Sequence, residues 1–244
     1  MIYNEDCITS LDLRFDSRMI DLTITSPPYN VGINYDAYND NRPYDEYISW
    51  LKTIFSRIYD KTVDGGRCAI NIGDGKNGSI AKHSHIISMM GEIGWLTKST
   101  IIWQKNHSSL NTSWGTFNSP LNPSFVTTFE YILIFCKQSY KLCTNGITDL
   151  TKSEFTQWSR AIWNISGKRD VDHPASFPVI IPYRLIKMLT WTDSLIYDPF
   201  AGVGTVGVAS KQLNREFIGS EISAVYSEIG NQRIINEPIF INNN

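Results

Sequence analysis

The sequence has no stretch of about 18 consecutive apolar residues, which a membrane-spanning helix requires. Its first residues show neither the basic start nor the apolar run of a signal peptide, so we expect a cytoplasmic protein. None of the four cysteines forms a C-x-x-C pair, which predicts buried thiols rather than a disulfide or zinc framework. His83 and His85 have no third ligand type close by in the sequence, and no metal is expected.

The chain also has little net charge, because 22 basic residues oppose 24 acidic ones for a formal charge of -2. That balance argues against a protein held to nucleic acid by bulk charge. The average hides an asymmetry, however. Residues 1–60 contain five basic and ten acidic residues, whereas residues 98–170 contain eight basic and four acidic ones. Any binding of nucleic acid is therefore expected on one face, and it should be sensitive to salt.

Hydrophobic residues make up 42% of the 244 positions, which is enough for one large globular domain. Short apolar runs alternate with helical patterns, and this order predicts a mostly parallel α/β sheet with helices on both faces. A turn is expected at residues 64–66. The expected strands cover residues 22–25, 67–72, 97–103, 131–136, 194–197 and 217–219. The expected helices cover residues 44–60, 86–90, 182–191, 205–213 and 224–235.

A glycine-rich turn at residues 198–205 (Asp-Pro-Phe-Ala-Gly-Val-Gly-Thr) joins an expected strand to an expected helix. Glycines allow close approach of the backbone to a ligand, and a helix start offers free N–H groups. No Gly-Lys-Ser/Thr follows, which disfavours an NTPase. Glu221 ends the next strand nineteen residues after Gly202, close to the spacing of an acid that binds ribose hydroxyls. The pattern predicts a nucleoside-containing cofactor; a helix cap beside a surface Glu is the alternative.

A second turn, Ser26-Pro27-Pro28-Tyr29, lies at the carboxyl end of an expected strand, where open α/β sheets place their ligands. The two prolines stiffen the main chain and remove two N–H donors. Nearby carbonyls and the Ser26 hydroxyl then present acceptors, and Tyr29 offers a flat face. This set suits a planar ring that carries an exocyclic amino group, although an isolated turn of this kind can also be purely structural.

The combination of Ser-Pro-Pro-Tyr at 26–29 with a later Asp-Pro-Phe-x-Gly-x-Gly-Thr at 198–205 resembles the amino-group DNA methyltransferases. These enzymes use S-adenosylmethionine (SAM) to methylate N4 of cytosine or N6 of adenine. The catalytic motif precedes the cofactor motif, an order similar to that of the circularly permuted β class. Other similar segments are residues 4–7, 101–105, 129–135 and 173–178.

The resemblance covers most of residues 1–236 and implies one catalytic domain over residues 1–244. The implied fold is a circularly permuted, Rossmann-like SAM-dependent methyltransferase with a small target-recognition insertion. Residues 106–125 and 139–170 have no match and are the candidate insertions. Asp6 is expected near the cofactor's adenine, and His173-Pro174 with Phe177 near its methionine end. The implied cofactor-binding residues are Asp6, Thr25, His173, Pro174, Phe177, Asp198, Pro199, Phe200, Gly202, Gly204, Thr205 and Glu221.

Direct in-line methyl transfer requires no covalent enzyme intermediate and no metal. The resemblance implies that Ser26, Pro27, Pro28 and Tyr29 are catalytic. The Ser26 hydroxyl and the Pro27 carbonyl would accept the two amino hydrogens, and Tyr29 would stack on a base flipped out of double-stranded DNA. Ser at the first motif position resembles N4-cytosine members, and N6-adenine methylation is the alternative.

Two other functions remain open at this point. Methyltransferases that act on protein glutamine or on RNA also use Pro-Pro-Tyr, but they generally place the cofactor motif first. A non-catalytic DNA- or nucleoside-binding protein would not need both motifs together, and this chain has both.

Two long polar loops, residues 30–43 and 106–125, are expected to be functional. Short polar groups in 106–125 suit base edges, and basic residues in 139–170 suit phosphates or guanine. The expected partner is double-stranded DNA, bound by a monomer or homodimer, with a cognate restriction endonuclease acting on the same site if the role is restriction–modification. The expected DNA-binding residues are Lys105, His107, Ser109, Asn111, Trp114, Lys141, Lys152, Arg160, Lys168 and Arg169.

Overall fold

The computed structural model describes residues 1–33, 37–75, 80–105, 115–167 and 177–237. Its strands are β1 (Ile2–Tyr3), β2 (Ile20–Thr25), β3 (Thr62–Ile72), β4 (Trp95–Lys105), β5 (Phe129–Lys137), β6 (Ile162–Ile165), β7 (Leu195–Asp198) and β8 (Glu216–Ser220). Its helices are α1 (Cys7–Arg14), α2 (Tyr44–Lys61), α3 (Lys82–Ile93), α4 (Lys152–Trp158), α5 (Ile180–Leu189), α6 (Thr205–Gln212) and α7 (Ala224–Asn236).

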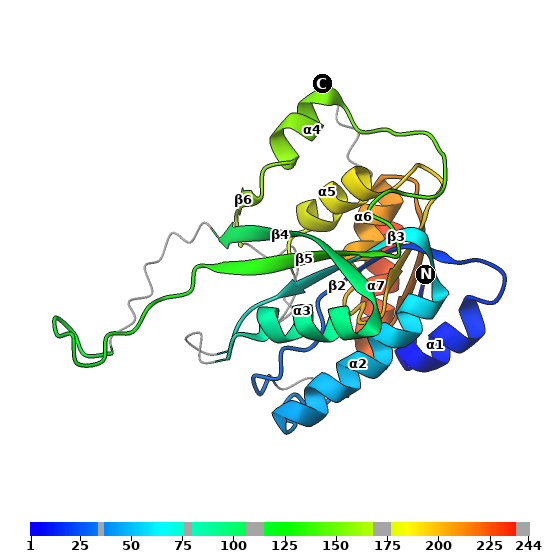
Figure 1. Cartoon of the computed structure of the whole chain (residues 1–244). Coiled ribbons are helices and arrows are strands. Elements are labelled where there is room, and N and C mark those ends of the chain that lie inside the picture. Colours follow the sequence, from blue (N-terminus) through cyan, green and yellow to red (C-terminus); the bar gives the residue numbers. More distant parts are fainter. Residues whose placement is uncertain (34–36, 76–79, 106–114, 168–176, 238–244) are drawn as a thin grey trace.

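The strands form one sheet in the order β1-β8-β7-β2-β3-β5-β4-β6 (Figure 1). Strand β5 is antiparallel to both of its neighbours, and the remaining pairs are parallel. The parallel strands therefore end at one common edge of the sheet. From β7 the chain continues to β8 on one side, and from β2 it continues to β3 on the other. The order reverses between β7 and β2, which is where open α/β sheets place a ligand.

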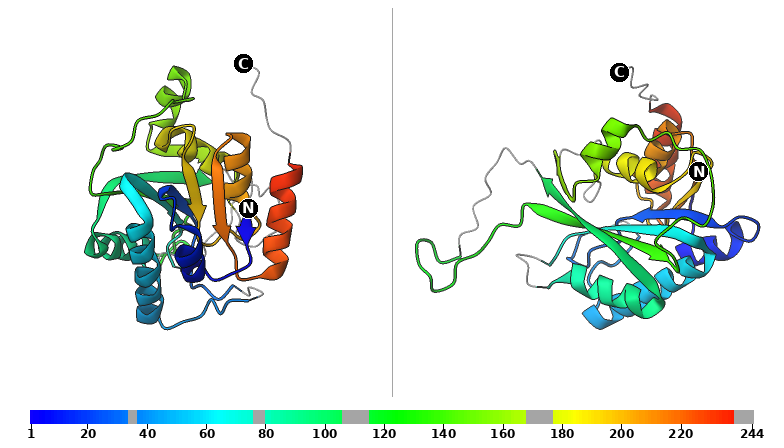
Figure 2. Two further views of the ribbon diagram at one scale, coloured as in Figure 1. Left: turned by 90° about the vertical axis from the view of Figure 1, so that its right-hand side faces the viewer. Right: turned by 45° about the horizontal axis from the view of Figure 1, so that its top comes forward.

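Two hydrophobic cores cover the two faces of the sheet, because the side chains of successive residues along a strand point to opposite faces. Cys68 and Ile70 of β3 pack into the first core with helices α1, α2 and α3. Ala69 between them faces the second core, which contains residues of α5 and α6. Helix α7 packs against α6 and β1 near the edge of the sheet (Figure 2). The predicted sheet with helices on both faces is confirmed.

Local sequence explains how the helices near the carboxyl edge begin. The Asp6 carboxylate accepts a hydrogen bond from the Ile8 amide and caps α1. The Ser223 hydroxyl accepts one from the Tyr226 amide and caps α7. Side-chain oxygens at these positions satisfy helix N–H groups that have no partner within the helix. Both caps immediately follow strands, so they hold the chain close to the edge where β1 and β8 end.

The predicted strands and helices are present, with ends that differ by a few residues. The predicted turn at 64–66 is wrong, because these residues lie within β3. There the pairing jumps from Ile20–Thr62 to Leu22–Arg67, so the residues between form an irregularity in the strand. Strands β1 and β6 and helices α1 and α4 were not predicted. Each is short, and short elements carry little periodic signal.

Three cysteines are buried as predicted, but Cys143 is exposed. Within the described ranges, no helix has the length and apolar character needed to cross a membrane.

Candidate active site

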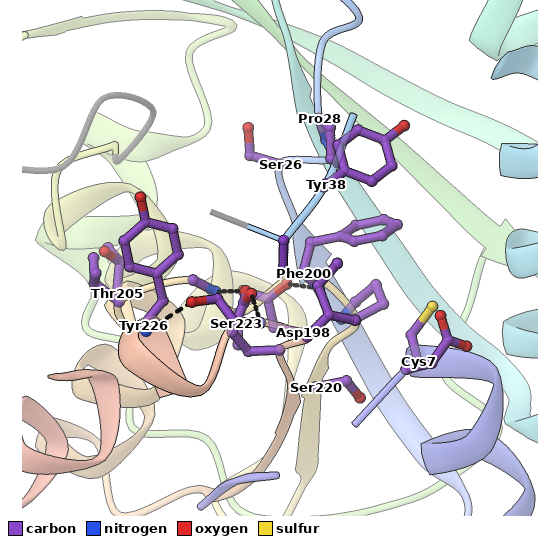
Figure 3. A pocket seen from close by; sticks show the side chains of 18 of the residues that line it. Cys7, Ser26, Pro28, Tyr38, Asp198, Phe200, Thr205, Ser220, Ser223 and Tyr226 are labelled. Atoms are coloured by element: carbon purple, nitrogen blue, oxygen red, sulfur yellow. Dashed lines mark hydrogen bonds between the residues drawn. The ribbon is translucent and has the colours of Figure 1, made fainter. Parts of the chain in front are cut away.

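A pocket of about 270 Å³ lies at the carboxyl edge, over the ends of β1, β8, β7 and β2. It brings together the two motifs, which are more than 170 residues apart in the sequence. Figure 3 shows Ser26 and Pro28 on one side of the pocket, and Asp198, Ser220 and Ser223 on the other. The predicted residues in its lining are Asp6, Ser26, Pro28, Phe177, Asp198, Pro199, Phe200, Gly202, Thr205 and Glu221.

Asp198 ends β7 and is 3% exposed. Its Oδ1 accepts hydrogen bonds from the Thr25 hydroxyl at 2.7 Å and from the Phe200 amide at 3.1 Å. Burial raises the pKa of Asp198 to about 7, although both hydrogen bonds favour its ionised form. The bond from Thr25 links the ends of β2 and β7, so Thr25 joins the two motifs without lining the pocket.

The Glu221 carboxylate lies between two turns. Oε2 accepts from the Gly202 amide at 2.9 Å, and Oε1 accepts from the Ser223 amide at 2.8 Å. Both oxygens of the carboxylate therefore accept from main-chain amides of the turns. Glu221 therefore shapes the glycine-rich turn and lines the pocket at the same time.

The second glycine of this turn has a different neighbour. Gly204 has a φ of +79°, and a Cβ on it would lie 2.9 Å from the carbonyl oxygen of Gly230 in α7. Its need for glycine therefore comes both from its left-handed backbone and from helix packing. Gly204 is also the residue that precedes α6.

Aromatic side chains form one wall of the pocket. Tyr38 stacks on Trp50 with ring centres 5.3 Å apart, and Trp50 contacts Phe200 at 5.5 Å. The Arg42 guanidinium lies 5.0 Å from the ring centres of both Tyr38 and Trp50. The buried Asp40 carboxylate accepts from the amides of the loop that begins at Asn30 and so holds this wall in place. Such a wall suits a planar ring.

The Pro-Pro-Tyr turn is held by side chains from other elements. The Tyr47 hydroxyl of α2 donates to the Pro28 carbonyl at 2.9 Å. The Lys82 ammonium at the start of α3 donates to the Tyr29 carbonyl, and burial lowers the pKa of Lys82. Both carbonyls therefore have structural donors. Among the residues that the structure describes, none donates in this way to the Pro27 carbonyl, which leaves that oxygen available as an acceptor.

A chain of polar groups extends from Ser26 into the protein. The Ser26 hydroxyl lies 3.1 Å from the Tyr29 hydroxyl, which in turn lies 3.0 Å from Oε2 of Glu130. The side-chain amide of Asn71 in β3 donates to the Tyr29 hydroxyl oxygen at 2.8 Å and to Glu130 Oε2 at 2.7 Å. The Lys105 ammonium pairs with Oε1 of Glu130. The ring of Tyr29 lies beside Gly73, so its hydroxyl points towards β3 and β5.

Several predicted residues lie elsewhere. Pro27, Tyr29, Thr25 and Gly204 adjoin the pocket in sequence but are not in its lining. The predicted residues that fall outside the described ranges are His107, Ser109, Asn111, Trp114, Lys168, Arg169, His173 and Pro174.

The predicted basic residues that the structure describes, Lys105, Lys141, Lys152 and Arg160, are not in the pocket lining. Lys105 is engaged by Glu130. Lys141 follows β5, which runs away from the carboxyl edge, and its backbone lies against Gly65 near the start of β3. Lys152 begins α4, whose Glu154 pairs with Lys187 near the end of α5. Lys141, Lys152 and Arg160 are all exposed, and the first two lie towards the opposite edge of the sheet.

Part of the described stretch 139–167, a candidate insertion, belongs to the sheet and its core. Strand β6 pairs with β4 as the edge strand of the sheet, and Trp158 and Trp163 are buried in the second core. These residues complete the domain itself.

Sequence reasoning missed the aromatic wall and the polar groups behind the Pro-Pro-Tyr turn. Nothing in the sequence around Tyr38 and Trp50 distinguishes aromatic residues that line a pocket from aromatic residues of the hydrophobic core. Asn71 and Glu130 did carry a signal, because each is a polar residue within an apolar strand. A buried polar group in such a strand needs a partner, and here the partner is the Tyr29 hydroxyl.

Comparisons with known proteins identify the family. The chain matches the N6/N4 DNA methylase family over residues 20–232. It is 35% identical to the type II methyltransferase M.MjaVI of Methanocaldococcus jannaschii, covering 70% of this chain and 89% of that protein.

Solved structures show the same fold. TTHA0409 of Thermus thermophilus, a candidate DNA modification methylase in complex with S-adenosyl-L-methionine, has a TM-score of 0.75 at 24% identity, over 96% of this chain and 92% of that one. PvuII DNA methyltransferase, which is cytosine-N4-specific, has a TM-score of 0.74 at 22% identity, over 100% of this chain and 86% of that one.

The fold and the site define an amino-group DNA methylase. This chain belongs to the N6/N4 DNA methylase family, together with type II restriction–modification methyltransferases.

Proposed function

We propose that this chain transfers a methyl group from SAM to the exocyclic amino group of a flipped base in double-stranded DNA, with N4 of cytosine as the favoured target. The observation that carries the proposal is the shared pocket, where Ser26 and Pro28 of one motif face Asp198, Phe200 and Gly202 of the other. When bound, SAM supplies a methyl group made electrophilic by its sulfonium.

The pocket lining fits such a cofactor. Asp6, Asp198 and Glu221 provide three carboxylates for a ligand that carries positive charge. The aromatic wall of Tyr38, Trp50 and Phe200 suits adenine, and Glu221 presents a carboxylate at the end of β8, where an acid can accept from ribose hydroxyls. The predicted roles of Asp6 at the adenine and Glu221 at the ribose are therefore kept as part of this proposal.

The chain's own residues would bind and activate the amino group. The Ser26 hydroxyl and the Pro27 carbonyl accept its two hydrogens, which favours a pyramidal nitrogen and stabilises the positive charge that develops on it. The turn is stiff because two prolines fix it and Tyr47 and Lys82 hold its later carbonyls. Acceptors that are fixed before the base arrives need no reorganisation during the reaction.

Serine at position 26 favours cytosine over adenine, following the resemblance of this motif to N4-cytosine members. The order of the two motifs along the chain likewise favours a circularly permuted arrangement. DNA would approach the carboxyl edge, from which residues 115–125 of the β4–β5 connection project away from the sheet (Figure 1). Exposed Phe117, Leu121 and Phe125 lie on this projection, so we keep it as a target-recognition element.

The test is methylation of an unmethylated, mixed-sequence plasmid with SAM, followed by nucleoside mass spectrometry and modification-sensitive sequencing. We expect N4-methylcytosine at one short recurring sequence. N6-methyladenine alone would overturn the choice of base, and absence of any methylated base would overturn the proposed function. A Ser26→Ala protein, which should transfer methyl groups far more slowly, serves as the control for contaminating methylases.

The type II relatives make a cognate restriction endonuclease the expected partner. If the host encodes one, plasmid methylated by this chain should resist that endonuclease at the mapped sequence. Cleavage of fully methylated plasmid would argue for an orphan or phage-protection role instead. Sedimentation of the protein with and without a duplex that contains the mapped site will distinguish a monomer from a homodimer.

A further inference from the structure

Ser26, Tyr29 and Glu130 are joined by a series of hydrogen bonds, and the donor in each bond follows from the chemistry of the groups. An ionised carboxylate only accepts hydrogen bonds, so the Tyr29 hydroxyl donates to Glu130 Oε2 at 3.0 Å. The main-chain oxygen of Asn71 lies farther from the same hydroxyl, at 3.5 Å. The single hydrogen of Tyr29 is therefore directed at the carboxylate.

The hydrogen bond from Tyr29 to Glu130 determines whether the Ser26 hydroxyl donates or accepts. Because the Tyr29 hydroxyl donates its single hydrogen to Glu130, Ser26 must be the donor in the 3.1 Å hydrogen bond between the Ser26 and Tyr29 hydroxyls. The serine hydrogen then points at Tyr29, away from the pocket. None of the described residues donates to the Ser26 oxygen, so both of its lone pairs can accept from a group in the pocket that Ser26 lines. Catalysis on an amino group needs an acceptor there, and this chain of hydrogen bonds provides it.

Glu130, the last group in this series of hydrogen bonds, is itself firmly held. Its side chain is 14% exposed, and it receives hydrogen bonds from Lys105 of β4 and Asn71 of β3. Asn71 also donates to the Tyr29 oxygen, so one amide group fixes both partners of the tyrosine–glutamate bond. Three strands therefore cooperate to place one carboxylate two hydrogen bonds behind the serine.

We propose that Glu130 is a positioning residue that acts through Tyr29 to fix the Ser26 hydroxyl as an acceptor, and that it receives along the same chain the proton lost by the methylated amino group. This inference rests on the proposed methyl transfer to an amino nitrogen. It adds a role for a residue outside both motifs.

The proton step balances along the observed contacts. An N–H bond of the methylated amino cation breaks, its electron pair stays on nitrogen, and the proton forms an O–H bond at Ser26. Ser26 passes its original hydrogen to the Tyr29 oxygen, and Tyr29 passes its own to Glu130 Oε2. The nitrogen and the carboxylate both end neutral, and each hydroxyl ends with one hydrogen as it began. Bulk water then takes the proton from Glu130.

The test uses Glu130→Gln, which keeps the size of the side chain but removes the charge. With radiolabelled SAM and the plasmid of the first experiment, the single-turnover rate should fall about 100-fold, the scale of general acid–base effects. SAM affinity by calorimetry and the thermal midpoint should stay close to those of the wild type. The matched control is Glu154→Gln, since Glu154 also pairs with a lysine, Lys187, but belongs to the capping box of α4.

A double-mutant cycle separates this role from a structural one. If Glu130 acts through Ser26, Glu130→Gln should cause no further loss in a Ser26→Ala background. Additive losses, or a Glu130→Gln rate within about threefold of wild type, would overturn the inference while the proposed function stands. An inactive wild type would instead count against the proposed function itself.

Discussion

The glycine-rich turn and the Pro-Pro-Tyr turn face each other across one pocket, but contacts of different range hold them. Glu221 binds the amides of Gly202 and Ser223, which are 19 and 2 residues away. Tyr29 is held by Asn71 and Glu130, which are 42 and 101 residues away. The contacts of Glu221 thus lie within one strand–helix–strand unit, whereas the contacts of Tyr29 come from side chains of other strands.

This difference bears on how each half of the pocket, the cofactor half at the glycine-rich turn and the catalytic half at the Pro-Pro-Tyr turn, responds to substitution. A change in the cofactor half should alter SAM affinity, because its groups would contact the cofactor directly. A change behind the catalytic turn should alter the rate of transfer and leave SAM affinity intact. Substitutions in the two halves test that separation, from the largest expected effect to the smallest.

Ser26→Ala removes the proposed acceptor for the amino group. The single-turnover rate should fall about 100- to 1000-fold, the usual cost of losing one preorganised hydrogen-bonding group at a developing charge. SAM affinity, measured by calorimetry, should not change. Equal losses in rate and in affinity would show that the two halves are not separable at this position.

Glu221→Ala removes the carboxylate expected at the ribose. SAM binding should weaken by about 2 kcal/mol, or about 30-fold in Kd, the scale of hydrogen bonds to a charged group. The rate at saturating SAM should be largely retained. Glu228→Ala on the exposed face of α7 is the control. Unchanged affinity in the Glu221 variant would refute its assignment as a cofactor ligand.

Asp198 should make SAM binding depend on pH, because burial raises its pKa to about 7. A cationic ligand favours the ionised carboxylate, so affinity should fall about tenfold between pH 8 and pH 6. Asp198→Asn should flatten that profile. A wild-type profile that is flat, or that rises towards pH 6, would contradict this role.

The ligand-free protein should show the opposite sign. The pKa of Asp198 is raised above its unfolded value of 3.8, so its contribution to stability is present at low pH and declines as pH rises through about 7. Asp198→Asn should therefore lose less stability than wild type between pH 6 and pH 8. Thermal denaturation without SAM measures this difference.

Tyr47→Phe removes one hydroxyl that supports the catalytic turn from behind. The lost hydrogen bond to the Pro28 carbonyl should cost about 1 kcal/mol in unfolding free energy and slow transfer several-fold. SAM affinity should be unaffected. Tyr59→Phe on the same helix is the control, and equal effects of the two substitutions would remove the special role of Tyr47.

Much of this architecture could be predicted because it is local. The apolar period of α2 and the runs of β3 and β5 appear directly in the sequence, as does the spacing from Gly202 to Glu221. Strand β6 could not be predicted, because its four residues become a strand only by pairing with β4. The DNA-binding role of the basic residues of 139–170 stays a prediction, since linear charge does not say at which edge of a sheet a loop lies.

The sequence by itself determined the class of fold and, through two motifs and their order, the family, because each motif and each periodic element consists of residues that are close together along the chain. Only the tertiary structure decided what stands behind Ser26. Tyr29, Asn71, Lys82 and Glu130 meet because α3 and the strands β2, β3 and β5 end or begin at the same edge of one sheet. Hydrogen bonds act over about 3 Å in space, and separation along the chain places no limit on them.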